Sequence, residues 1–167
     1  SARTIGAINT VVARRGKWVG HNTDGVGFWA SLPVVWKRSV SGSSVLILGA
    51  GGTARAIVKM LMDQKVRRIV VANRTARKGG RLIKEISRWA PRVTCEVIPW
   101  QSKSIGKALS EVDWVINTTS VGLQKSDKLP LPTMAKGFSL KVFDVLYHTR
   151  ETPLLKWAAH HHFPAMN

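Results

Sequence analysis

The sequence predicts an α/β fold, a doubly wound parallel sheet with helices on both faces. Two observations support this. Short apolar runs alternate with amphipathic segments along most of the chain, and a glycine-rich turn separates the first such pair. Strands that alternate with helices form right-handed crossovers, which require a parallel sheet covered on both sides. The prediction applies to residues 44–167, because residues 1–43 show a different pattern.

The first strand and helix of the sheet are the clearest. The run SVLILGAG (44–51) is apolar throughout and stops at glycines, as expected of a strand buried on both faces. TARAIVKMLMDQ (53–64) then places Ala56, Met60 and Leu61 on one side of a helix. The further expected strands are 67–73, 93–99, 113–122 (running into a loop) and 140–147, and the further helices are 75–90, 102–112 and 152–162.

Residues 1–43 resemble the edge of another unit. GAINTVVARRGKWVG (6–20) predicts two strands around a turn at Arg14–Gly16, and a short helix is expected to begin at Asp24. The stretch 33–43 is interpreted as a linker. We therefore expect residues 1–43 to be a short N-terminal remnant of a second α/β domain, comprising its last strands and a linking helix.

Composition limits the class of protein. The chain of 167 residues is 44% hydrophobic and 21% charged, and its single cysteine, Cys95, excludes a disulfide framework. No apolar run approaches the roughly 18–20 residues of a membrane span, and the N-terminus lacks the apolar stretch of a signal peptide. A cytoplasmic protein without membrane contact is expected. The histidines at 160–162 have no second set of ligands, so no metal site is expected.

The formal net charge of +17 raises the expectation of a polyanionic partner. Ten lysines and arginines lie between Lys65 and Arg92, with one acid, Glu85. No RNA-recognition aromatic signature, zinc-finger spacing or basic zipper accompanies them, so nucleic acid is not expected to be the primary ligand. The alternative is a non-enzymatic basic module that binds nucleic acid or an acidic partner.

GAGGTA (49–54) follows a buried strand and precedes a helix, with the pattern G-x-G-x-x-A. Gly49 would permit the tight turn, Gly51 would let a pyrophosphate approach the backbone, and Ala54 would keep the helix close to the sheet. The free N–H groups and dipole of the helix start would hold the phosphates. Such glycines can also serve only as a turn, but the context favours a Rossmann-like dinucleotide-binding domain over 44–167. The expected contacts are Gly49, Ala50, Gly51, Gly52, Thr53 and Ala54.

The end of the second strand, in the segment ANRTARK, predicts which dinucleotide binds. NAD sites usually place Asp or Glu here to hold the ribose 2′-hydroxyl, and this segment has no acid. Arg74 can pair with a 2′-phosphate, Asn73 and Thr75 can hydrogen-bond beside the ribose, and Lys78 or Arg77 adds positive charge. NADP is therefore favoured over NAD. The structural alternative is that Thr75 caps the following helix and that the basic residues form a solvated face. NADP binding and this alternative can hold at once.

Several motifs extend along nearly the whole chain. They are GAINT (6–10), NTDG (22–25), GAGGTARA (49–56), NRT (73–75), NTTSVGL (117–123), and DVLY followed by ETPLL (144–155). In this order and spacing they resemble the shikimate dehydrogenase family, including its quinate/shikimate relatives. The resemblance implies an NADP-binding Rossmann domain joined to an α/β substrate domain, with the active site between them. It also implies reversible reduction of 3-dehydroshikimate to shikimate by NADPH, in aromatic amino-acid biosynthesis.

Carried over by position, the resemblance implies that Asn9 and Asp24 are ligands of substrate hydroxyls and that Tyr147 lies near the substrate carboxylate. The loop residues implied beside the nicotinamide half of the cofactor are Thr119, Ser120 and Val145. From the residues alone, Asn9 could simply close a turn and Thr119–Ser120 could cap a helix. Thr23 or Asp24 is also expected to cap the short helix that follows it.

In the family that the chain resembles, a lysine paired with the aspartate matching Asp24 exchanges the hydroxyl proton during hydride transfer. The lysine's motif and the Ser-rich motif for the substrate carboxylate do not occur in this sequence. We therefore expect the chain to be part of a longer protein, to bind NADP, and not to turn over by itself. Surface left uncovered by the other part would favour self-association. His21 and His148–Thr149 depart from the family pattern.

Overall fold

The computed structural model describes residues 2–124, 126–134, 138–147 and 151–167. Six strands of this described chain form one parallel sheet. They are β3 (Ser44–Leu48), β4 (Arg68–Asn73), β5 (Thr94–Pro99), β6 (Trp114–Asn117), β7 (Lys141–Asp144) and β8 (Ala165–Met166). Their spatial order is β5-β4-β3-β6-β7-β8, which corresponds to 3-2-1-4-5-6 within the sheet. This is the order of doubly wound dinucleotide folds, so the predicted fold class is confirmed.

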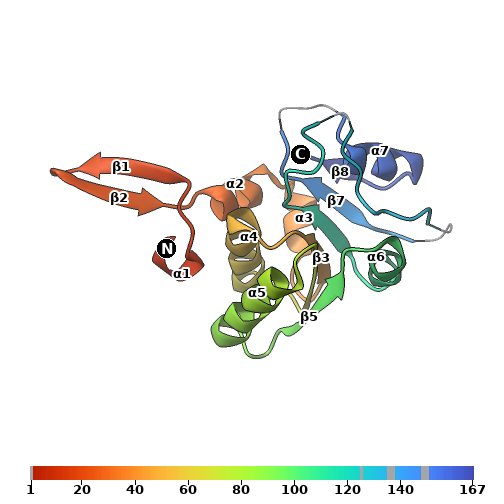
Figure 1. The fold of residues 1–167 in the computed structure, drawn as a ribbon, viewed down its shortest axis with the longest axis horizontal. Coiled ribbons are helices and arrows are strands. Elements are labelled where there is room, and N and C mark those ends of the chain that lie inside the picture. The colour runs from red at the N-terminus through yellow and green to blue at the C-terminus, as the bar shows by residue number, and fades with distance from the viewer. Residues whose placement is uncertain (1, 125, 135–137, 148–150) are drawn as a thin grey trace.

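Helices cover both faces of the sheet (Figure 1). They are α4 (Gly52–Asp63), α5 (Ala76–Trp89), α6 (Ser102–Leu109) and α7 (Pro153–His160). These elements agree with the predicted ones to within a few residues at their ends. The two-residue strand β8 was not predicted, because it is too short to show a periodic pattern.

The strands alternate between two cores, as their period of two residues requires. In β3, Val45 and Ile47 belong to a core shared with α4 and α5, whereas Leu46 and Leu48 belong to a core shared with α6 and α7. All four side chains are fully buried. A strand covered on both sides must be apolar at every position, which explains the uninterrupted run that the sequence shows here.

The N-terminal part contains α1 (Ala2–Ile5), β1 (Thr10–Arg14), β2 (Lys17–His21), α2 (Asp24–Ser31) and α3 (Val34–Arg38). β1 and β2 pair as an antiparallel hairpin that extends away from the rest of the molecule (Figure 1). Its turn lies at Arg15 and Gly16, both with positive φ, as a two-residue hairpin loop requires. The predicted pair of strands is confirmed. Trp18 on this hairpin is 79% exposed.

The interpretation of 33–43 as a linker is wrong. Residues 34–38 form α3, and the ring of Trp36 packs edge-on against Trp114 with centroids 5.3 Å apart. Val40, just beyond the helix, is fully buried. The stretch therefore contributes to the core. The short apolar pattern was too brief to indicate a helix.

α2 is packed closely against the sheet domain. A Cβ on Gly25 would lie 2.6 Å from the carbonyl oxygen of Ala56, so only glycine permits the approach of α2 to α4. Phe28 meets Phe143 of β7 edge-on, with ring centroids 4.9 Å apart. This contact brings the NTDG segment to the carboxyl end of β7. The division of the chain at residue 43 stays a prediction.

Candidate active site

A cavity of about 370 Å³ lies where α2, the start of α4 and the segment after β7 meet. Four residues expected at the site line it, namely Asp24, Thr53, Val145 and Tyr147. They come from three segments far apart in the sequence. The carboxyl ends of parallel strands meet at one edge of a sheet, and this is where such sheets bind ligands.

The glycine-rich turn lies at the point where the strand order reverses, between β3 and β6. Gly49 has φ +106°, and a Cβ there would lie 2.8 Å from Cγ2 of Thr119 and 2.9 Å from Oγ1 of Thr118. Its N–H donates to the carbonyl of Ala72, at 2.8 Å. Both the backbone conformation and the close approach of the loop after β6 therefore require glycine at this position.

The turn fits a phosphate group. Gly51 is exposed, and a Cβ on it would meet nothing within 4 Å, so the space above the turn is open. The N–H of Arg55 donates to the carbonyl of Gly51, at 3.1 Å, as the first bond inside α4. The three preceding N–H groups, of residues 52–54, therefore have no acceptor inside the helix. They point outward at the positive end of the helix dipole. Ala54 is fully buried and holds α4 on the sheet.

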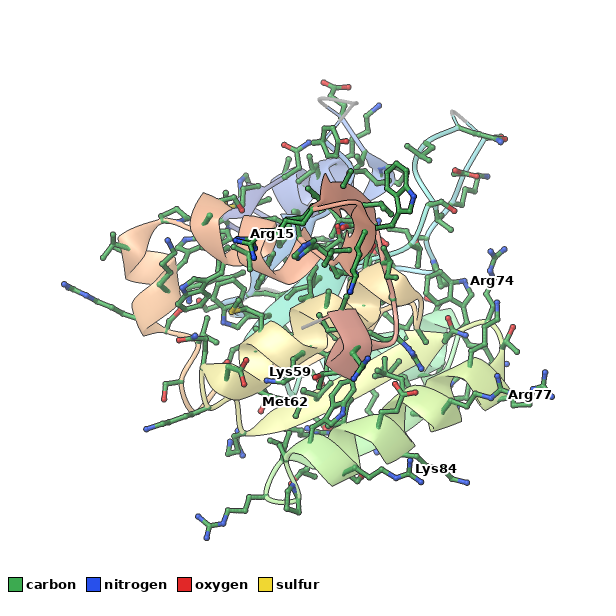
Figure 2. All side chains as sticks on the ribbon, turned by 90° about the vertical axis from the view of Figure 1, so that its left-hand side faces the viewer. Arg15, Lys59, Met62, Arg74, Arg77 and Lys84 are labelled. Atoms are coloured by element: carbon green, nitrogen blue, oxygen red, sulfur yellow. The ribbon has the colours of Figure 1, made fainter. Side chains whose placement is uncertain are left out.

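The turn after β4 presents the predicted residues at the surface. Asn73 donates from Nδ2 to the carbonyl of Thr75, at 2.9 Å, and Arg74 and Lys78 are exposed. Figure 2 shows Arg74 and Arg77 projecting outward near the same end of α5. A second cavity of about 560 Å³ is lined by Asn73 and Arg74 together with residues at the end of β5 and just after it. Thr75 occupies the N-cap position and the basic residues beside it are exposed, as the structural alternative predicts, but the Thr75 side chain makes no capping hydrogen bond.

A carboxylate that the sequence did not place near this turn comes from the loop after β6. The N–H groups of Gly122 and Gln124 donate to Asp127 and lower its pKa, and the positive charge of Arg74 lowers it further. Asp127 lies more than fifty residues beyond Arg74 in the sequence, so a local search for an acid at the strand end could not find it.

Asp24 is held in place by Asn9, whose Nδ2 donates to Oδ1 of Asp24 at 2.6 Å. Oδ1 of Asn9 accepts from the N–H of Thr23, at 3.1 Å, while Oδ1 of Asn22 accepts from the N–H of Asp24, also at 3.1 Å. Thr23 occupies the N-cap position, but its side chain does not cap α2. The predicted position of the cap at Thr23 is confirmed, but the hydrogen bonds at the start of the helix come from the two asparagines and not from the Thr23 side chain.

The loops expected beside the nicotinamide are fixed by a buried pair that sequence reasoning did not single out. Asp144 is fully buried and accepts from Nδ2 of Asn117, the N–H of Leu146 and Oγ1 of Thr152, at 2.9, 3.1 and 2.6 Å. Burial raises the pKa of Asp144, while these hydrogen bonds oppose the shift. Asp144 stands directly before Val145 and therefore sets the path of the cavity-lining segment. The DVLY motif contained the signal, since an aspartate ends an otherwise apolar strand.

Asn117 also organises the loop after β6. Its Oδ1 accepts from the N–H and the hydroxyl of Thr119, at 3.1 and 2.7 Å, which turns the Thr119 methyl toward Gly49. Ser120 is exposed, and its carbonyl accepts from Leu123 in a turn, at 3.2 Å. Residues 118–124 contain no helix, so Thr119 and Ser120 do not cap one. Tyr147 is 75% exposed at the cavity rim, and His148–Thr149 lie outside the described residues.

Comparison with known proteins identifies the family. Residues 35–125, more than half of the chain, match the family model described as Shikimate / quinate 5-dehydrogenase. The chain belongs to the shikimate/quinate 5-dehydrogenase family. A shikimate dehydrogenase (NADP(+)) of Magnetococcus marinus is 40% identical over 162 residues, which are 96% of this chain and 56% of that protein.

Several solved structures share the fold. A shikimate 5-dehydrogenase from Listeria monocytogenes, in complex with shikimate and NAD, superposes with a TM-score of 0.83 at 26% identity, over 99% of this chain and 59% of that one. A ligand-free 5-ketofructose reductase of a Gluconobacter strain gives a TM-score of 0.78 at 33% identity, over 99% and 58%. The chain spans somewhat more than half the length of the relatives it matches.

Two further properties concern the described ranges only. None of their helices combines the length and the apolar character that crossing a membrane would require. They also contain no group of three or more histidine, cysteine, aspartate or glutamate side chains placed to hold a metal ion.

Proposed function

We propose that this chain is the NADP-binding portion of a shikimate dehydrogenase, which reversibly reduces 3-dehydroshikimate to shikimate with NADPH. The observation that carries the proposal is the 370 Å³ cavity, because it joins Asp24, from the NTDG segment, to Thr53 at the start of the phosphate-binding helix. A substrate hydroxyl at Asp24 and a dinucleotide at α4 would meet in that space. The name of the Magnetococcus relative supports the same activity.

The preference for NADP rests on the turn after β4. The relatives differ, since the Magnetococcus protein is named for NADP(+) and the Listeria structure holds NAD. In this chain Arg74 and Lys78 are exposed at the turn, and its own residues include no acid that would repel a 2′-phosphate. A guanidinium and a phosphate form a charge-assisted, two-pronged hydrogen bond. The charge of Arg74 lowers the pKa of Asp127 in another loop, so that carboxylate is a nearby negative charge that would oppose binding of the phosphate.

The residues of this chain would have different roles in the reaction. The bound cofactor supplies or accepts the hydride. Asn9 fixes Oδ1 of Asp24, so that Oδ2 can accept from a substrate hydroxyl and hold or exchange its proton. Tyr147 at the rim would bind the substrate carboxylate. The loop residues Thr119, Ser120 and Val145 would border the nicotinamide. No segment of the sequence matches the motif that carries the family's catalytic lysine, so turnover by this chain alone is not expected.

The test is a fluorescence titration with NADPH and, separately, with NADH. Tighter binding of NADPH is expected, and equal or absent binding would refute the proposal. Arg74→Ala should weaken NADPH selectively, by about 1–3 kcal/mol or roughly 5- to 150-fold, and leave NADH unchanged. Arg88→Ala is the matched control, because it removes the same charge from the far end of α5.

A further inference from the structure

α5 carries a row of cations of which only the first lies beside the cofactor turn. We define this cationic row as Arg77, Arg81, Lys84 and Arg88, all exposed. At 100° per residue, its members fall within an arc of about 60° and extend about 17 Å along the helix. Leu82 and Ile86 occupy the opposite, buried face. Figure 2 shows Arg77 and Lys84 projecting from this outer side of α5.

The acids of the chain are engaged elsewhere. The nine carboxylates divide into two sets. Those in ion pairs are Asp63 with Lys59, Glu85 with Arg55, Glu96 and Glu111 with Arg68, and Glu151 with Lys156. Those held by hydrogen bonds from asparagine, threonine or backbone groups are Asp24, Asp113, Asp127 and Asp144. Glu85 lies on α5 itself, yet it turns toward α4. Among the described residues, no ion pair involves the cationic row.

We propose that the cationic row binds the phosphodiester backbone of a nucleic acid, independently of the dinucleotide site. Adjacent members lie about 4.5–6 Å apart along the helix, so each can meet a different phosphate of a strand that carries one charge per roughly 3.4 Å. Three of the four are arginines, whose planar guanidinium suits phosphate better than an ammonium does. The row begins beside Arg74 but continues well beyond the reach of one 2′-phosphate.

An acidic protein is the less favoured occupant. Protein interfaces centre on buried apolar or aromatic anchors. The large exposed hydrophobic side chains of the described residues lie elsewhere, on the hairpin, α2, α3 and the later loops, and none is on α5. The surface around the row offers charge without such an anchor, which is the character of contacts that position a phosphate backbone.

The test measures binding of labelled single-stranded and duplex oligonucleotides by fluorescence anisotropy between about 50 and 200 mM salt. The triple variant Arg81→Gln/Lys84→Gln/Arg88→Gln removes three cations and keeps Arg77 and Lys78 beside the cofactor turn. The slope of log K against log salt should become less negative by about 2.7 for duplex or about 2.1 for single strands. The oligonucleotide, single-stranded or duplex, that loses more affinity in this variant is the preferred nucleic acid.

The matched control removes the same charge from the tip of the hairpin, as Arg14→Gln/Arg15→Gln/Lys17→Gln. Its slope should change by less than one. Equal changes in both triple variants would overturn the inference, as would displacement of the oligonucleotide by saturating NADPH or equal competition by polyglutamate. The α5 variant should keep its NADPH affinity, so the two proposals can fail separately.

Discussion

Two glycines in one turn should respond to alanine in opposite ways. Gly49 has φ +106°, and a Cβ there would lie 2.8–2.9 Å from Thr118 and Thr119. Gly51 has φ −87° with an extended ψ, and a Cβ there would meet nothing within 4 Å. Gly49→Ala therefore perturbs the folded state, whereas Gly51→Ala alters only the open space where a pyrophosphate would approach.

The magnitudes follow from these contacts. For Gly49→Ala, an unfavourable backbone conformation costs about 1–3 kcal/mol and overpacking against the loop after β6 about 1–3 more, so about 2–6 kcal/mol is expected. For Gly51→Ala, the backbone conformation suits alanine, and the less flexible unfolded chain should raise stability by about 0.4–1 kcal/mol. Its NADPH affinity should fall by about 1–3 kcal/mol, since the Cβ takes space needed by the ligand.

Urea unfolding followed by circular dichroism measures the first quantity, and NADPH titration of each folded variant measures the second. A Gly49→Ala variant as stable as the parent chain, or a Gly51→Ala variant with full affinity for NADPH, would contradict these expectations. A loss of stability in Gly51→Ala comparable to that in Gly49→Ala would equally contradict them, because the space above residue 51 would then be filled.

Three other outcomes are expected. Burial raises the pKa of Asp144 above its ordinary value of 3.8. The contribution of Asp144 to the free energy of unfolding is therefore present below pH 3.8 and is lost as the pH rises through the raised pKa. Asp144→Asn should flatten this dependence of stability on pH, measured by urea titrations at several pH values. Phe28→Ala should cost about 3–5 kcal/mol by the same assay, because it empties the contact with Phe143. Asp24→Asn should lower the free energy of unfolding by about 0.3–1 kcal/mol, since it removes a negative charge from the first turn of α2. It should leave NADPH affinity unchanged. A tenfold loss of NADPH affinity would contradict the assignment of Asp24 to the substrate side.

The sequence was most informative where one physical requirement acts on adjacent residues. Strand β3 is buried on both faces, so Ser44–Leu48 is almost entirely apolar, and the glycine turn follows it at once. The alternation of strands and helices is also visible in neighbouring segments, and it predicted the parallel sheet. The hairpin was predicted because its turn needs residues such as Gly16 at positive φ.

What could not be predicted depends on residues that are distant in sequence. Trp36 makes α3 part of the core only because Trp114 lies beside it. The caps of α2 come from Asn9 and Asn22, not from a residue in the first turn, so a local rule chose the wrong side chain. The electrostatic influence of Arg74 on Asp127 likewise arises from the tertiary fold, and no spacing pattern in one sequence indicates it.

The projecting hairpin and the central sheet are expected to open on different timescales. A lone two-stranded sheet is marginally stable in water, whereas the amides of β3 are enclosed by strands on both sides. Hydrogen exchange in β1 and β2 should therefore be fast, and exchange in β3 should approach the rate of global unfolding. Asn9 stands at the base of the hairpin, where its N–H donates to the carbonyl of His21. The orientation of Asp24 thus depends on the boundary between a rapidly opening segment and a slowly opening one.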